Sequence, residues 1–109
     1  MNLTDYQERS RVTAVYPDAG ANLLYPTLGL CGEAGEVAEK VKKMIRDDGG
    51  VLSDQRRDAL AAELGDVLWY VAQLATEARL DLDAIARDNL DKLASRRRRG
   101  ALSGSGDER

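Results

Sequence analysis

The hydrophobic positions along this chain recur every three or four residues, which is the spacing of one buried helix face. Turn-forming residues and prolines interrupt the pattern three times, so it falls into four segments. The pattern therefore predicts four helices, spanning about Asp5–Val15, Pro26–Arg46, Asp54–Ala78 and Leu82–Arg97.

Residues that favour helix starts support these boundaries. Thr4 and Gln7 have the spacing of a capping box for the first helix. Ser53 or Asp54 can cap the third helix, and Asp81 can cap the fourth. An all-α fold is expected, in the form of a four-helix bundle built on a hairpin of the second and third helices.

The chain ends in a segment of a different character. Residues 100–109, GALSGSGDER, are rich in Gly and Ser and contain no hydrophobic stripe. We therefore predict a helical domain over residues 1–97 and a C-terminal arm over residues 98–109.

The two middle helices share the pattern Glu, any residue, Gly, acid, Val. It places Glu33 and Glu36 on one flank of the second helix, and Glu63 and Asp66 on the equivalent flank of the third. The short turn at residues 47–52 requires the two helices to be antiparallel, which puts both pairs at the same height and on the same side. We therefore expect the four carboxylates to converge.

Four converging carboxylates repel one another unless a cation neutralises them. Ligands that are all oxygen, without imidazole or thiolate, favour Mg²⁺, with Mn²⁺ as a possible substitute. The alternative is that the acids are solvated surface residues in pairs such as Glu36 with Lys40. Metal binding is the better interpretation, because two pairs recur in phase within the same Gly-Val frame.

Composition excludes several other kinds of site. The chain has no His and a single Cys, which excludes a conventional zinc site, a Cys-His nucleophile and a Ser-His-Asp triad. Cys31 is expected to be a small buried hydrophobe. The net charge of -3 is too mild to indicate general nucleic-acid or membrane binding.

Chain length bears on assembly and on location. A chain of 109 residues buries only one small core, so oligomerisation is expected. No segment is apolar and long enough to span a membrane, and the N-terminus lacks the apolar region of a signal peptide. A cytoplasmic protein is expected.

The order GLCGEAGEVAEKVKK, ELGDVLWY, NLDKLASR resembles the MazG-type nucleotide pyrophosphohydrolases of the all-α NTP pyrophosphatase superfamily. Their signature is Glu-x-x-Glu followed after a spacer by Glu-x-x-Asp, and the closing RRGALSGSGDER is similar to the tail of short bacterial and phage members. The resemblance implies Mg²⁺-dependent cleavage of a nucleoside triphosphate to a monophosphate and pyrophosphate, in the service of nucleotide-pool house-cleaning. It also implies assembly as a dimer or tetramer.

The resemblance implies roles for individual residues. Glu33, Glu36, Glu63 and Asp66 would be the metal ligands and the catalytic residues, with a metal-bound water, or a water held by one of the glutamates as a base, attacking the α-phosphorus. Six further residues are candidates for substrate binding: Lys40, Lys43, Tyr70, Asn89, Lys92 and Arg96. Lys92 and Arg96 would contact the phosphates and Asn89 the sugar or base.

These assignments have alternatives. Lys92 and Arg96 can belong to a solvated basic helix end, and Asn89 can be a structural amide. Trp69 is expected in the core or in a subunit interface. The arm either folds over a nucleotide site or forms a disordered basic tail.

Two other functions are consistent with the sequence. One is a non-catalytic helical dimerisation module that senses a metal or a nucleotide. The other is a nucleic-acid-binding protein that uses the arginine run 96–99, although the overall acidity and the lack of interleaved aromatics count against it.

Overall fold

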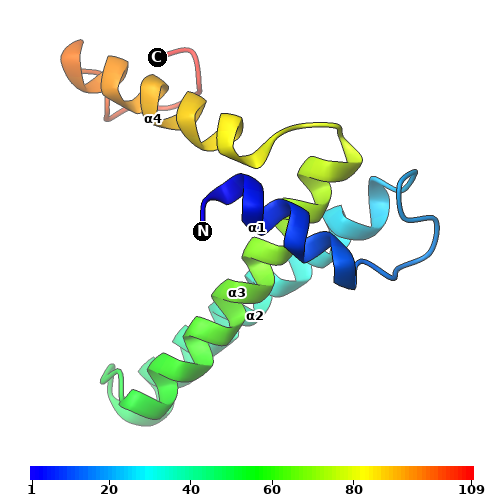
Figure 1. Cartoon of the computed structure of the whole chain (residues 1–109). Coiled ribbons are helices and arrows are strands. Elements are labelled where there is room, and N and C mark those ends of the chain that lie inside the picture. Colours follow the sequence, from blue (N-terminus) through cyan, green and yellow to red (C-terminus); the bar gives the residue numbers. More distant parts are fainter.

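The computed structural model describes residues 1–109 and contains only helices (Figure 1). In chain order they are α1 (Leu3–Ser10), the short 3-10 helix η1 (Arg11–Thr13), α2 (Leu24–Asp48), α3 (Asp54–Glu77) and α4 (Leu82–Arg98). The all-α class is confirmed, and α2, α3 and α4 begin and end within about two residues of their predicted limits.

Helices α2 and α3 form the predicted antiparallel hairpin and lie side by side along their length (Figure 1). Gly49 ends α2 with φ of 62° and Gly50 follows with φ of 83°, both in the left-handed region that glycine adopts without strain. Ser53 then caps α3, since its side chain accepts a hydrogen bond from the backbone N–H of Arg56 at 3.2 Å. The turn therefore fixes which flanks of the two helices meet.

The hydrophobic stripes of the hairpin are only partly covered. Val37 and Val67 are half-buried between the helices, whereas Ile45 is 60% and Leu64 52% exposed. A pair of helices can cover only one side of stripes this wide. An apolar face therefore remains on the hairpin, formed by Ala38, Val41, Ile45, Leu64 and Leu68.

The most buried part of the chain lies where α1 crosses the C-terminal half of α3. Ala72 and Ala75 of α3 are buried there, and so is the side chain of Gln73, which donates to the hydroxyl of Ser10 at 2.8 Å. Small residues on α3 allow α1 to approach closely, and the paired amide satisfies the polar groups that this approach buries.

The N-terminus of α1 differs from the prediction. Asn2, not Thr4, is the cap, and its side chain accepts from the backbone N–H of Asp5 at 2.8 Å. Gln7 does not complete a capping box, because its side chain donates to the hydroxyl of Thr76 at 3.0 Å and so joins α1 to α3. A tertiary contact therefore uses the Gln7 side chain that the sequence pattern assigned to the cap.

The C-terminus of α1 also differs, since the helix ends at Ser10 and not near Val15. The chain tightens into η1, where the hydroxyls of Ser10 and Thr13 donate to the carbonyls of Gln7 and Ser10. Hydroxyl groups that bond to the backbone in this way compete with a continuing α-helix.

Glu77 joins the segment between α1 and α2 to the end of α3. Its fully buried carboxylate accepts from the Arg11 guanidinium at 2.7 Å, from the Tyr16 hydroxyl at 2.8 Å and from the backbone N–H groups of Gly20 and Asn22. Burial by itself would raise the pKa of Glu77, but these donors outweigh it and lower the pKa to about 2. Glu77 is therefore charged at any ordinary pH.

Helix α4 leaves the hairpin and packs against α1 (Figure 1). The predicted cap is confirmed, because the side chain of Asp81 accepts from the backbone N–H of Asp83. The joint before it includes Arg79 at φ of 59°, a left-handed conformation that is uncommon for a residue with a side chain. None of the helices has the length and apolar character needed to cross a membrane.

Candidate metal centre

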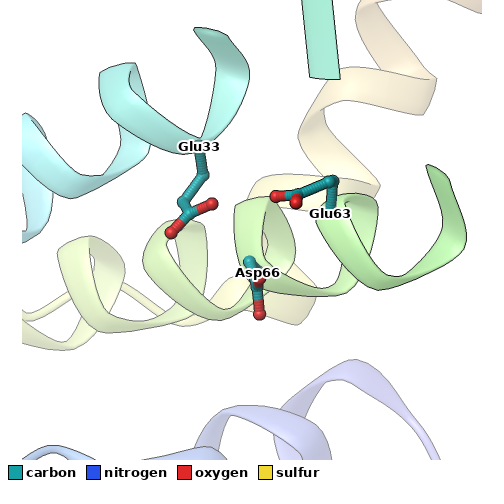
Figure 2. A group of neighbouring side chains, drawn as sticks. All are labelled: Glu33, Glu63 and Asp66. Atoms are coloured by element: carbon teal, nitrogen blue, oxygen red, sulfur yellow. The ribbon is translucent and has the colours of Figure 1, made fainter. Parts of the chain in front are cut away.

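Three carboxylates meet on one flank of the hairpin (Figure 2). Glu33 comes from α2, and Glu63 and Asp66 come from α3, one turn apart. One carboxylate oxygen from each lies within 4.8 Å of the others, and Figure 2 shows Glu33 and Glu63 pointing toward one another. We call these three residues the acidic trio.

The electrostatics of the acidic trio favour a bound cation. Burial raises the pKa of Glu33, and the neighbouring carboxylates of Glu63 and Asp66 raise it further. Lys40 compensates little, because its Nζ lies 3.9 Å from the carboxylate of Glu63. The set contains only oxygen donors at a spacing that one divalent ion can bridge, so these residues fit Mg²⁺ or Mn²⁺.

Glu36 lies next to the acidic trio but outside it. Its side chain is exposed on the turn of α2 that follows Glu33, and its charge contributes to the raised pKa of Glu33. The structure therefore brings three of the four predicted ligands together and leaves Glu36 beside them.

Aromatic side chains border the acidic trio on the side away from the hairpin turn. Tyr70, one turn beyond Asp66, is half-buried, and a side chain at Gly29 would overlap its ring. Burial raises the pKa of the Tyr70 phenol, and Tyr25 and Glu33 raise it further. Tyr70 therefore lies beside the metal centre, where its candidate role requires it to be.

Tyr6 of α1 also lies near the acidic trio and was not among the candidate residues. Burial raises the pKa of its phenol, and the charge of Asp66 raises it further. The sequence pattern assigned Tyr6 only to a thin apolar stripe, since nothing local indicates that α1 crosses α3 at this height.

The other aromatic residues of this region pack within the chain. Trp69 is edge-on to Tyr16 and Tyr70, with ring centroids 6.4 and 5.0 Å away, and its indole N–H donates to the hydroxyl of Thr13 at 2.9 Å. The prediction that Cys31 is buried is wrong. Its side chain is exposed, because the face of α2 on which it lies has no neighbouring helix in this chain.

The predicted substrate-binding lysines of α2 follow the acidic trio toward the hairpin turn. Lys40 is one turn beyond Glu36 and is 33% exposed. Lys43, a further turn along, is half-buried and lines the same hollow as Lys40. Both are therefore on the flank of the hairpin that holds the metal centre.

The structure does not bring the candidates of α4 to the metal centre of the same chain. Asn89 is exposed on α4, which extends away from the hairpin (Figure 1). Lys92 pairs with the carboxylate of Asp107 at 3.2 Å, and Arg96 donates to the backbone carbonyl of Asp107 at 2.6 Å and to its carboxylate at 3.3 Å.

The C-terminal arm folds back along α4 and buries Arg96, which is only 3% exposed. Arg109 closes the arm by donating to the backbone carbonyls of Leu102 and Gly106. Lys92 and Arg96 also lower the pKa of the Asp107 carboxyl. In a single chain the arm therefore covers the end of α4 and not the acidic trio.

The comparisons with known proteins match a part of the chain that includes the acidic trio. Residues 24–100 match the family model described as the MazG nucleotide pyrophosphohydrolase domain. The chain is 51% identical to the Gene 37 protein of Mycobacterium phage L5 over 114 aligned residues, which cover the whole of both chains. No solved structure matches the chain.

Proposed function

This chain belongs to the MazG nucleotide pyrophosphohydrolase family, and we propose that it cleaves nucleoside triphosphates between the α and β phosphates. The products are a nucleoside monophosphate and pyrophosphate, and the cofactor is Mg²⁺, which Mn²⁺ can replace. The proposed role is removal of surplus or non-standard (deoxy)nucleotides from the cellular pool.

The acidic trio is the observation that carries this proposal. Glu33, Glu63 and Asp66 place three oxygen ligands within 4.8 Å of one another in a chain that has no His. With Glu36 beside them, these residues would hold the metal. A bound Mg²⁺ would neutralise phosphate charge and make a water more acidic.

The residues around the trio have separate tasks. One of the glutamates holds the attacking water and accepts its proton as the water attacks the α-phosphorus, and pyrophosphate leaves. Lys40 and Lys43 offer donors to the phosphates, and Tyr70 lies against the nucleoside.

We further propose that the working form is a homodimer or homotetramer. A single chain holds Asn89, Lys92 and Arg96 away from the acidic trio, so in this proposal α4 of a second copy brings them to it. Only four hydrophobic residues are buried in the single chain: Tyr16, Ala72, Ala75 and Leu82. The apolar face of the hairpin defined above would be covered by the second copy.

The test is a product analysis. The purified protein is incubated with canonical and modified (deoxy)nucleoside triphosphates, with Mg²⁺ or with EDTA, and the products are separated. We expect monophosphate and pyrophosphate in the Mg²⁺ reactions only. Diphosphate with orthophosphate would show that another bond is cleaved. No turnover of any substrate, despite metal binding, would favour a sensing module.

A further inference from the structure

A basic hollow of about 610 Å³ lies between the acidic trio and the hairpin turn. Lys40 and Lys43 line it from α2, and Arg56 and Ala59 line it from α3. These residues continue the helical spacing of the acids, since positions 33, 36, 40 and 43 share one flank of α2 and positions 66, 63, 59 and 56 share the facing flank of α3. The hollow and the metal centre therefore lie along the same flank of the hairpin.

The hollow has an excess of positive charge. Three cationic side chains and one carboxylate, that of Asp48, line it. Arg56 is held by Asp48 at 2.7 Å, and Lys40 lies only within 3.9 Å of Glu63. Lys43 forms no ion pair in the chain, so its ammonium group is free to bind an anion.

The backbone adds to this charge. Ser53, the cap of α3, lines the hollow, so the N-terminus of α3 opens into it. The partial positive charge of a helix N-terminus favours anions, and phosphates in particular. Side chains and backbone therefore select the same class of ligand.

This flank of the hairpin has a chemical order. Its end at the turn is basic, its middle is acidic, and its far end carries Tyr70 and Tyr25. Lys43 is seven residues beyond Glu36, which corresponds to about 10 Å along the helix axis. A nucleoside triphosphate has the matching order, with terminal phosphates, an α phosphate at the metal, and a base.

We propose that the basic hollow binds the β and γ phosphates of the substrate, the part that leaves as pyrophosphate. This inference rests on the proposed function and gives the substrate a direction along the hairpin. It assigns Lys43, Arg56 and the N-terminus of α3 to the leaving group. The hollow thereby selects triphosphates over mono- and diphosphates.

The test compares Lys43→Ala with Lys42→Ala. Lys42 is the neighbouring lysine on α2, but it pairs with Glu39 at 2.8 Å, is 59% exposed and lies outside the hollow. Lys42 is exposed and Lys43 is half-buried without an ion pair, so both variants should fold, which circular dichroism checks. The readouts are KM and kcat for a triphosphate, and calorimetric titration with inorganic pyrophosphate and with a nucleoside monophosphate.

Lys43→Ala should raise KM for the triphosphate and the Kd of pyrophosphate by about tenfold, the usual effect of losing one charge-assisted hydrogen bond. Monophosphate affinity should be unchanged, because a monophosphate does not reach the hollow. Lys42→Ala should leave all values within about twofold. Equal effects of the two variants would overturn the proposal, as would an equal loss of monophosphate and pyrophosphate affinity in Lys43→Ala.

Pyrophosphate titration keeps this inference separate from the proposed function. If the wild-type protein cleaves no triphosphate, the proposed function fails, yet pyrophosphate binding that is lost in Lys43→Ala still supports the hollow. If the protein cleaves triphosphates but does not bind pyrophosphate, the reaction stands and the hollow is wrongly assigned.

Discussion

Glu33 and Glu63 face each other across the α2–α3 hairpin, each at the start of the same Glu, any residue, Gly, acid, Val pattern (Figure 2). Residues 31–40 and 61–70 also follow the same order of exposed and half-buried positions. The hairpin thus presents equivalent acids from both helices to one point.

Neutralising the acids should abolish turnover. Asp66→Asn removes a charge from the acidic trio and Glu36→Gln removes one beside it, both without changing side-chain size, so we expect pyrophosphate release to fall at least ~100-fold. Helicity measured by circular dichroism should stay at the wild-type value. Asp58→Asn, an exposed position on α3, is the control and should retain activity. Persisting activity in both acidic variants would disprove the metal-site hypothesis.

Mg²⁺ should stabilise the folded protein. Neutralising the crowded carboxylates favours the native state, and a metal at about ten times its Kd contributes roughly 1.4 kcal/mol. The midpoint of thermal unfolding should therefore rise by a few degrees with Mg²⁺ and return to its original value with EDTA. Asp66→Asn should lose this response and Asp58→Asn should keep it. The same rise in Asp66→Asn would place the ion elsewhere.

Stability should fall in acid because of Glu77. Its pKa is about 2 in the folded chain, against an ordinary value of 4.5. A carboxyl with a lowered pKa contributes its full stabilisation above about pH 5, and this contribution is lost as the pH falls toward 2. Denaturant unfolding at a series of pH values should show this decline.

Glu77→Gln is the matching variant. It removes the buried negative charge that the four donors of Glu77 bind, so we expect the free energy of unfolding to fall by roughly 2–4 kcal/mol at pH 7. The difference from wild type should shrink as the pH approaches 2, where the wild-type carboxyl also becomes neutral. Glu8→Gln, at an exposed position of α1, should change stability by less than about 0.5 kcal/mol. A difference that does not vary with pH would contradict the assigned pKa.

Two glycines of α2 should respond to alanine in opposite ways. Gly29→Ala would place a methyl group in the ring of Tyr70, so we expect a loss of about 1–3 kcal/mol and impaired turnover as Tyr70 is displaced. Gly32 has nothing within 4 Å of the position of a side chain, and alanine there should stabilise the helix by up to about 1 kcal/mol. Thermal unfolding of both variants is the measurement.

The helix limits that the sequence predicted correctly depend on contacts between neighbouring residues. Ser53 and Asp81 cap α3 and α4 through their own side chains, and Gly49 ends α2, so these limits depend on nearby residues alone. The relative positions of the hairpin acids could also be predicted, because a short turn and helical spacing fix them.

Long-range contacts explain what the sequence did not predict. The side chain of Gln7 bonds to Thr76, far along the chain, and Tyr6 reaches the surroundings of Asp66 only because α1 crosses α3. The face of α2 that carries Cys31 has the composition of a buried surface but no neighbouring helix in one chain. The role of α4 likewise depends on which groups lie next to that helix.

The partners of Glu77 tie the N-terminal segment to the end of α3. All four of its donors, on Arg11, Tyr16, Gly20 and Asn22, precede residue 24, where the family match begins. Expressing the matched region alone would leave a buried carboxylate with no donor at the end of α3, a costly defect. The cooperative unit therefore extends into the N-terminal segment, which a domain boundary drawn from sequence similarity would discard.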